Sequence, residues 1–165
     1  MGNEILRFQF EPRRGDINEQ IFTNLLTHIV FSTKDREPLI VPELQPELYA
    51  YLGGLARELK GKAYGINGTS DHLHMLISLP PVVSMSDALR ILKSNSSGWV
   101  HDKWPRRRSF AWQLGYGAFS VSKSNEVLKY IGNQEAHHRR IAFKEEFIDL
   151  LRRHEIEYDE RYIWA

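Results

Sequence analysis

One stretch, DHLHMLIS at residues 71–78, alternates apolar and polar side chains with a period of two, which is typical of a half-buried β-strand. Its apolar positions, beginning at Leu73, would face a core. His72 and His74 would share the other face, about 7 Å apart at Cα. Two neutral imidazoles on one strand face can chelate a divalent metal. The pair alone leaves a second interpretation open, in which one histidine caps a hairpin and the other is a half-buried, hydrogen-bonded residue.

The composition limits the class of protein. The chain has 165 residues, of which 42% are hydrophobic and 26% charged, which predicts one globular domain with a sizeable core. It has no cysteine, which excludes disulfides, zinc–thiolate sites and thiol chemistry. No apolar run approaches the roughly 20 residues of a membrane span. We therefore expect no membrane association and a cytoplasmic location.

The net charge of +1 is unevenly distributed. Residues 90–144 hold eleven Lys/Arg and three Asp/Glu, a balance of +8, whereas residues 145–165 have a balance of −4 and residues 1–89 of −3. A basic segment of this kind favours a polyanion such as nucleic acid, although a solvated face balanced by the acidic tail fits the charge equally well. The candidate nucleic-acid contacts are Lys93, Asn95, Arg106, Arg107, Arg108, Lys123 and Lys129.

The order of the expected elements indicates a fold. Strands are predicted at 25–33, 63–68, 72–79 and 110–121, and helices at 42–60, 84–101, 125–138 and 143–154. Through residue 121 this is the β-α-β-β-α-β order of a ferredoxin-like α+β fold, an antiparallel sheet with both crossover helices on one face. A later helix would cover the histidine face. We expect an N-terminal arm at 1–22, the main domain at 23–140, and a C-terminal helix with an acidic tail at 141–165.

A second chemical motif, YIGNQ, occupies residues 130–134. Tyr130 and Gln134 are four residues apart and would lie on one helical face, which His138 extends by another turn. A phenol and a carboxamide can supply a nucleophile and an oxygen ligand for a metal. The alternative is an ordinary amphipathic helix in which Tyr130 packs and Gln134 is solvated.

Together, THIVF at 27–31, DHLHMLI at 71–77 and YIGNQ at 130–134 resemble the single-tyrosine HUH transposases of bacterial insertion sequences (the IS200-like family), including relatives associated with repetitive extragenic palindromes. The resemblance covers about residues 23–140. It implies that His72, His74 and Gln134 bind Mg2+ or Mn2+ and that Tyr130 is the nucleophile.

The same resemblance implies the reaction and the partners. Single-stranded DNA would be cleaved and rejoined at hairpin-flanked element ends through a 5′-phosphotyrosine. The protein would be a homodimer whose active sites are assembled in trans, with the tyrosine helix of one subunit serving the histidines of the other.

Other functions and residues compete with these assignments. A non-catalytic single-stranded nucleic-acid-binding domain derived from such a transposase is the main alternative. An RNA phosphoesterase with paired His-x-Thr/Ser motifs fits less well, because only one His-x-His occurs. Tyr116 is the rival nucleophile, although an aromatic residue between two glycines is more often structural. Trp104 and Trp112 are candidates for base stacking or for the core.

Overall fold

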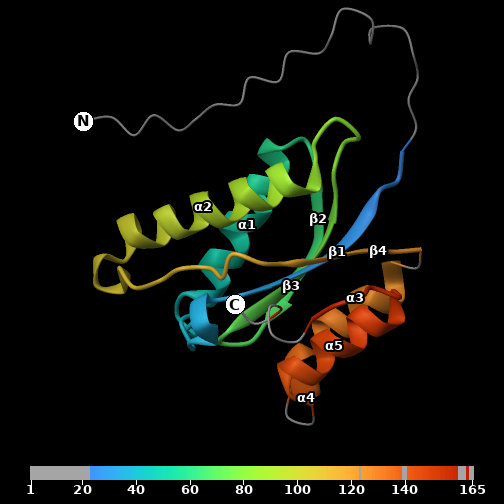
Figure 1. The fold of residues 1–165 in the computed structure, drawn as a ribbon. Helices are drawn as coiled ribbons and strands as arrows, with labels where there is room; N and C mark the ends of the chain where they lie inside the picture. Colours follow the sequence, from blue (N-terminus) through green and yellow to red (C-terminus); the bar gives the residue numbers. More distant parts are fainter. Residues whose placement is uncertain (1–22, 123, 139–140, 160–162, 164–165) are drawn as a thin grey trace, which may run out of the picture.

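A computed structural model describes residues 23–122, 124–138, 141–159 and 163 (Figure 1). The elements are, in chain order, β1 (Leu26–Ser32), η1 (Lys34–Arg36), α1 (Gln45–Glu58), β2 (Lys62–Gly68), β3 (His72–Ser78), α2 (Met85–Lys103), η2 (Pro105–Arg107), β4 (Gly117–Ser120), α3 (Ser124–Gly132), α4 (Gln134–His138) and α5 (Phe143–Arg153). The predicted arm at 1–22 lies outside the described residues, and the domain boundaries stay a prediction. Within the described part, no helix has the length and apolarity needed to cross a bilayer.

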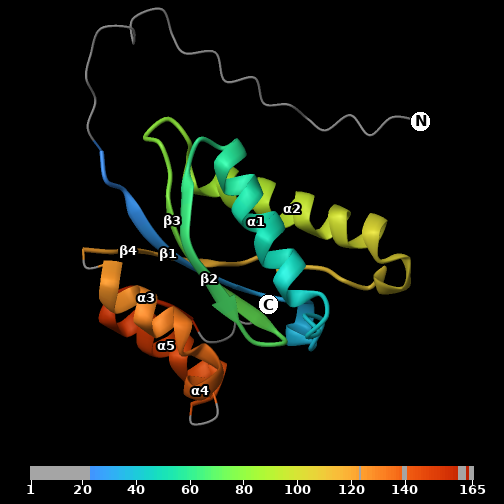
Figure 2. The ribbon, with the colours of Figure 1, turned by 180° about the vertical axis from the view of Figure 1, so that it is seen from behind.

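The four strands form one antiparallel sheet in the order β2-β3-β1-β4. Helices α1 and α2 cover one face of the sheet, and α3, α4 and α5 lie over the other (Figures 1 and 2). This arrangement confirms the predicted α+β class, with its crossover helices on one face and the tyrosine-bearing helix on the other.

The main core lies between the sheet and the two crossover helices. The apolar positions of β3, including Leu73, Met75 and Ile77, are fully buried against it, and each such side chain contributes about 1.5–3 kcal/mol. Helix α2 begins where the sequence predicts, because the Ser84 hydroxyl accepts a hydrogen bond from the backbone N–H of Asp87 at 3.1 Å. This core fixes β3 as a rigid support for the histidines on its other side.

The outer face of the sheet is covered by a smaller apolar cluster. Its buried members are Val30, Phe119, Phe143, Leu150 and Leu151. Beside it lies a group of buried polar residues, namely His28, His72, His74, Gln134 and Glu146. Burying so many polar groups is costly unless they are paired or bind a ligand, so this interface is where a functional site is expected.

The last strand is shorter than the sequence predicts. Of the expected strand at 110–121, only Gly117–Ser120 pairs with β1, while Trp112 forms an isolated bridge to Thr33. The Trp112 ring is 8% exposed, and its Nε1–H donates to the Ser96 hydroxyl at 2.8 Å. Trp112 is thus a core residue, and the Gln113 backbone N–H still donates to the Ser32 carbonyl at 2.9 Å, so the strand is interrupted between Gln113 and Gly117.

The helix predicted at 125–138 is two helices. The break falls at Asn133, whose backbone N–H is shared between the carbonyls of Lys129 and Tyr130, each at 3.2 Å. At the same place the Asn67 amide of β2 donates to the carbonyls of Ile131 (3.0 Å) and Gly132 (3.3 Å). An edge strand therefore takes over hydrogen bonds that a continuous helix would have made.

Candidate active site

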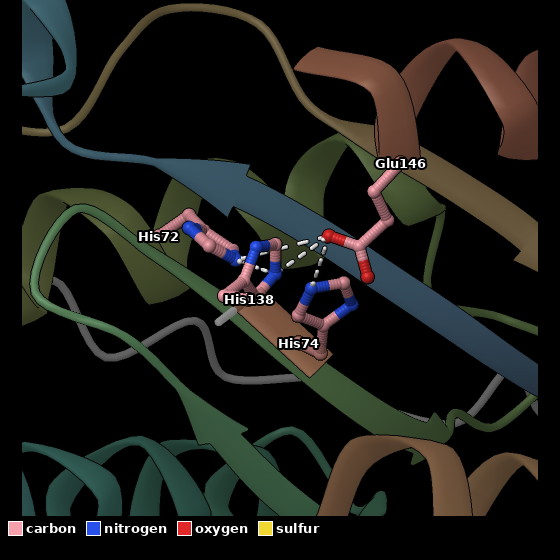
Figure 3. Close-up of side chains that lie close together, drawn as sticks. All are labelled: His72, His74, His138 and Glu146. Carbon is pink, nitrogen blue, oxygen red and sulfur yellow. Dashed lines mark hydrogen bonds and ion pairs between the residues drawn. The ribbon is translucent and has the colours of Figure 1, made fainter. Parts of the chain in front are cut away.

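Four potential metal ligands from three elements converge on one buried spot. Histidines 72 and 74 come from β3, His138 from α4 and Glu146 from α5, and one ligand atom from each lies within 4.8 Å of the other three (Figure 3). Glu146 Oε2 is 2.8 Å from His138 Nε2, 3.6 Å from His74 Nε2 and 4.0 Å from His72 Nε2. Two ligands bound to one ion at about 2.1 Å are at most about 4 Å apart, so the cluster is close to a coordinating arrangement.

The surroundings of His72 and His138 assign their tautomers. His72 Nδ1 lies 2.7 Å from the Asp71 carboxylate, and His138 Nδ1 lies 3.0 Å from the carbonyl oxygen of Ile141. Both partners only accept hydrogen bonds, so each Nδ1 carries the proton and each Nε2 presents a lone pair. These two Nε2 atoms lie 3.0 Å apart. His138 Nε2 also lies 2.8 Å from Glu146 Oε2 and 2.9 Å from Gln134 Oε1, so either a proton or a metal ion at this nitrogen would relieve the repulsion among these lone pairs.

His74 completes the set from a deeper position. Its Nδ1 is 2.9 Å from Nε2 of His28, and its Nε2 is buried without a hydrogen-bond partner. Burial lowers the pKa of His74 to about 4, the Glu146 carboxylate offsetting only part of that effect, and burial also lowers the pKa of His28 to about 3. Both rings are therefore neutral near pH 7. A neutral, orphaned imidazole nitrogen aimed at a carboxylate is suited to binding a metal.

Glu146 brings a full negative charge into this site. Burial by itself would raise its pKa, but contacts with His74, Tyr130 and His138 together outweigh burial and lower the pKa to about 2. Its side chain is nevertheless buried, with only 3% of its surface exposed, and Oε2 has no hydrogen-bond partner. An ionised, buried and incompletely satisfied carboxylate among imidazoles fits a divalent cation as the missing group.

The candidate nucleophile lies on the other side of the same carboxylate. The Tyr130 hydroxyl donates a hydrogen bond to Oε1 of Glu146, and its ring packs edge-on against His74 with centroids 5.7 Å apart. Burial, and then the neighbouring Glu146 charge, raise the pKa of Tyr130 well above its ordinary value. The phenol is thus held protonated, with one carboxylate between it and the imidazoles.

Gln134 is buried at the edge of the cluster. Its Oε1 lies 2.9 Å from His138 Nε2, while its Nε2 donates to the Tyr130 carbonyl at 3.3 Å and lies 3.4 Å from Glu146 Oε1. The structure therefore brings together the sequence-predicted residues His72, His74, Tyr130 and Gln134. Gln134 contacts the cluster through both His138 and Glu146, and its assignment as a metal ligand stays a prediction.

The predicted nucleic-acid contacts are dispersed. Lys93 donates its amine to the carbonyls of Leu114 (2.8 Å) and Gly115 (3.0 Å), and Lys129 is exposed on α3. Asn95 is half-buried on α2, and Arg106, Arg107 and Arg108 follow that helix on the opposite side of the sheet from the cluster. Lys123 lies outside the described residues. The roles of these side chains in binding DNA stay predictions.

Three important residues were not assigned to the site from the sequence. His138 was recognised only as an extension of the Tyr130–Gln134 face, and His28 only as part of the THIVF motif, without a role of its own. Glu146 was missed altogether. A signal for it does exist, because Glu146 falls on the apolar stripe of α5 formed by Phe143 and Leu150, where a carboxylate needs a partner.

Comparison with known proteins agrees with this geometry. The family described as "Transposase IS200 like" matches residues 21–134. The transposases for insertion sequence element IS200 from Salmonella typhimurium and Salmonella typhi are each 29% identical over 118 residues, covering 67% of this chain and 77% of theirs.

Two solved structures share the fold. A transposase candidate from Deinococcus radiodurans R1 has a TM-score of 0.58 and 22% identity, covering 70% of this chain and 95% of that one. A REP-associated tyrosine transposase bound to a REP hairpin has a TM-score of 0.53 and 13% identity, covering 74% and 76%. The match to residues 21–134, which spans both the histidine pair and Tyr130, shows that this chain belongs to the IS200-like transposase family.

Proposed function

We propose that this transposase cleaves and rejoins single-stranded DNA in a metal-dependent reaction that passes through a 5′-phosphotyrosine. One observation supports this most directly. Glu146 contacts the Tyr130 hydroxyl with one oxygen and the three imidazoles with the other. A nucleophile and a cation-binding cluster of the same chain therefore both contact one side chain, that of Glu146.

In the proposed step, the Tyr130 hydroxyl oxygen attacks the scissile phosphorus. The bond from Tyr130 to phosphorus forms as the bond from phosphorus to the 3′ oxygen breaks. The proton lost by the phenol is regained by the departing 3′-hydroxyl, and Glu146 Oε1 is placed to hold it in between. The reverse step, with a different 3′-hydroxyl, joins new strands without ATP, because the phosphotyrosine conserves the phosphodiester energy.

His72, His74, His138 and Glu146 would hold the cation. When bound, a divalent ion polarises the phosphate and neutralises developing charge. Of the two metals expected from the sequence, this nitrogen-rich set favours Mn2+ over Mg2+, which prefers oxygen ligands. Asp71, His28 and the Ile141 carbonyl orient the three imidazoles through their other ring nitrogens.

We further propose that the substrate is a single strand flanked by a hairpin. The support comes from the basic segment at 90–144 and from the fold relative whose structure holds a REP hairpin. Binding through backbone phosphates should weaken steeply as salt rises. Equal affinity for an unrelated duplex would contradict this substrate class.

The nucleophile is tested with a labelled hairpin oligonucleotide and Mn2+, followed by denaturing electrophoresis. We expect the parent protein to form a covalent protein–DNA adduct and Tyr130→Phe to form none, because only the attacking oxygen is removed. Tyr116→Phe is the matched control and should retain the adduct, since Tyr116 lies in the loop before β4. Addition of EDTA should abolish adduct formation.

Two outcomes decide against the proposal. An adduct that persists in Tyr130→Phe would remove this residue from the role of nucleophile. Tight hairpin binding by the parent with no adduct under any metal condition would favour the alternative of a binding domain without catalysis.

A further inference from the structure

A cavity of about 560 Å³ lies on the outer face of the sheet, next to the histidine cluster. Val30 and Ser32 of β1 contribute to its lining. In the strand register these are the direct partners of His74 and His72. Paired residues on antiparallel strands lie about 5 Å apart at Cα, so the cavity begins one strand away from the proposed phosphate position.

The cavity and the cluster share a wall. The Phe143 ring stacks on the His72 ring, with centroids 4.2 Å apart and planes inclined by 25°, and Phe143 also lines the cavity. The Arg36 guanidinium lies 5.7 Å from the centroid of the same ring. A DNA strand whose phosphate reaches the histidines would therefore pass its neighbouring nucleotide over this opening.

The chemistry of the lining fits a base better than a phosphate. The lining includes aromatic side chains on which a base can stack, namely Phe143, Phe147, Tyr116 and Tyr158. The charged residues of the lining balance, with Arg36 and Lys144 against Asp35 and Glu157. A phosphate needs a surplus of positive charge, whereas a flat base with hydrogen-bonding edges needs stacking surfaces and a few polar groups.

The polar edge of the cavity is held in a constrained turn. Asp35 and Arg36 both have left-handed backbone angles, with φ of 54° and 56°, a conformation that costs about 1 kcal/mol or more for such residues. The turn is fixed by a hydrogen bond of 3.1 Å from the Asp35 backbone N–H to Oε1 of Gln113. This strain sets the position of the Asp35 and Arg36 side chains at the opening.

Next to this turn, the loop at 113–116 forms another part of the cavity rim and is supported by Lys93. Lys93 binds the carbonyls of Leu114 and Gly115, and this support leaves the Leu114 side chain 93% exposed and Tyr116 41% exposed. Large apolar groups displayed beside a cavity mark a contact surface. Here they adjoin a site that handles DNA.

We propose that this cavity receives the unpaired base next to the scissile phosphate, and that Asp35 accepts a hydrogen bond from an exocyclic amino group of that base. The inference rests on the proposed function for the position of the scissile phosphate. It adds a specificity determinant outside the metal and tyrosine site. Carboxylates discriminate in this way because they only accept hydrogen bonds.

The test is a binding selection that needs no cleavage. Tyr130→Phe protein is equilibrated with hairpin oligonucleotides carrying four randomised unpaired nucleotides on each side, and the bound fraction is sequenced. We expect one position near the hairpin to favour adenine, cytosine or guanine over thymine by about tenfold, the discrimination of one good base contact. Adding Asp35→Asn should remove or invert the preference at that position alone, because Asn tolerates the positive φ but also donates hydrogen bonds.

Two further variants make the result decisive. Glu157→Gln, which neutralises the second carboxylate of the lining, should alter the same position if that side chain shares the base edge. Glu43→Gln, on an exposed carboxylate outside the lining, should leave all preferences unchanged. The proposal is overturned if no position responds to Asp35→Asn in folded protein, whatever the response to Glu157→Gln, or if the pool is not bound at all.

The proposal of a base-binding cavity and the proposal of DNA cleavage can be rejected independently of each other. A preference that depends on Asp35 in a protein whose parent never forms an adduct would keep the cavity and reject the proposed cleavage. Normal adduct formation with no response to either cavity variant would do the reverse.

Discussion

The two oxygens of Glu146 face different chemical groups, the phenol on one side and the imidazoles on the other. In the proposed mechanism, a single carboxylate would therefore set both the charge of the metal site and the position of the nucleophile. In His72 and His138, a neighbouring acceptor holds a proton on the far ring nitrogen, so a change at Glu146 should act on metal affinity while leaving these two contacts in place.

Glu146→Gln should weaken Mn2+ binding by at least about tenfold. Replacing a residue that only hydrogen-bonds to a metal ligand already lowers the metal affinity by about that factor. The amide oxygen can still accept from Tyr130, so the packing of α3 should survive. Isothermal titration calorimetry measures the affinity. Glu145→Gln changes an exposed carboxylate on the same helix and should bind Mn2+ like the parent; equal loss in both variants would show a general charge effect.

A second prediction at this scale concerns Lys93 and the pH dependence of the free energy of unfolding. Burial lowers its pKa to about 8, from an ordinary value of 10.5. Between these values the unfolded chain holds a proton that the folded chain releases, so the free energy of unfolding should rise with pH in this window. Relative to Lys93→Met, the parent should gain about 1–3 kcal/mol between pH 8 and 10.5 in urea unfolding. A constant difference would show that the two carbonyl partners keep the amine charged.

Among the elements, the junction of α3 and α4 best explains how Tyr130 and Gln134 are placed. Asn67 lies opposite His74 in the sheet register and also binds the carbonyls at the helix break. The same strand pair therefore positions both an imidazole and the tyrosine helix. Without this support, the carbonyls of Ile131 and Gly132 would lose these hydrogen bonds.

Replacements at this junction should shift stability in opposite directions. Gly132→Ala should stabilise the protein by about 0.4–1 kcal/mol, because the added Cβ meets no atom within 4 Å and the backbone angle is not left-handed. Asn67→Ala should destabilise it by about 1 kcal/mol through lost hydrogen bonds. Thermal or chemical unfolding measures both. Destabilisation by Gly132→Ala would mean that the break requires glycine.

Helices and strands with a clear pattern in their own sequence could be predicted. Those whose limits depend on long-range packing could not. The alternation of β3 and the Ser84 cap of α2 are local signals, and both are found in the structure. The residues before β4 look like a continuous strand, but the pairing with β1 is interrupted between Gln113, whose backbone N–H still donates to the Ser32 carbonyl, and Gly117, where β4 begins. The break at Asn133 likewise depends on Asn67, 66 residues earlier in the chain, which no local pattern reveals.

The same distinction applies to the site. His72, His74, Tyr130 and Gln134 could be identified because they recur within short motifs. Glu146 could not, because the acidic pair 145–146 reads as an ordinary helix start, and only the packing of α5 on the sheet shows which carboxylate turns inward. A charged turn at 34–38 could be predicted, but the left-handed backbone angles of Asp35 and Arg36 could not, because no local pattern signals them.

At the scale of the whole molecule, one chain brings Tyr130 to its own His74. These contacts favour a site completed in cis. The homodimer assembled in trans, implied by the family resemblance, stays a prediction that requires α3 and α4 to leave Asn67. Exchange between subunits would preserve the same chemistry but change which chain supplies each residue.

Mixing two inactive proteins, Tyr130→Phe and His72→Ala, distinguishes the arrangements. A cis site predicts no recovery of adduct formation, because each chain carries its own defect. A trans site in a freely exchanging two-fold dimer predicts recovery of roughly a quarter of the parent rate, because half the dimers are mixed and each has one intact site. Recovery in a mixture shown to exchange would overturn the cis arrangement.

The cation-binding cluster is drawn from β3, α4 and α5. This has a consequence for how copies of a transposase gene decay in a genome. A gene copy interrupted just after the Tyr130 codon still encodes the histidine pair and the tyrosine. Its product would lack Glu146 and would leave the Val30–Phe119 side of the sheet uncovered. We expect such a remnant to aggregate rather than persist as an unregulated DNA-cutting fragment, so that inactivation by truncation is complete.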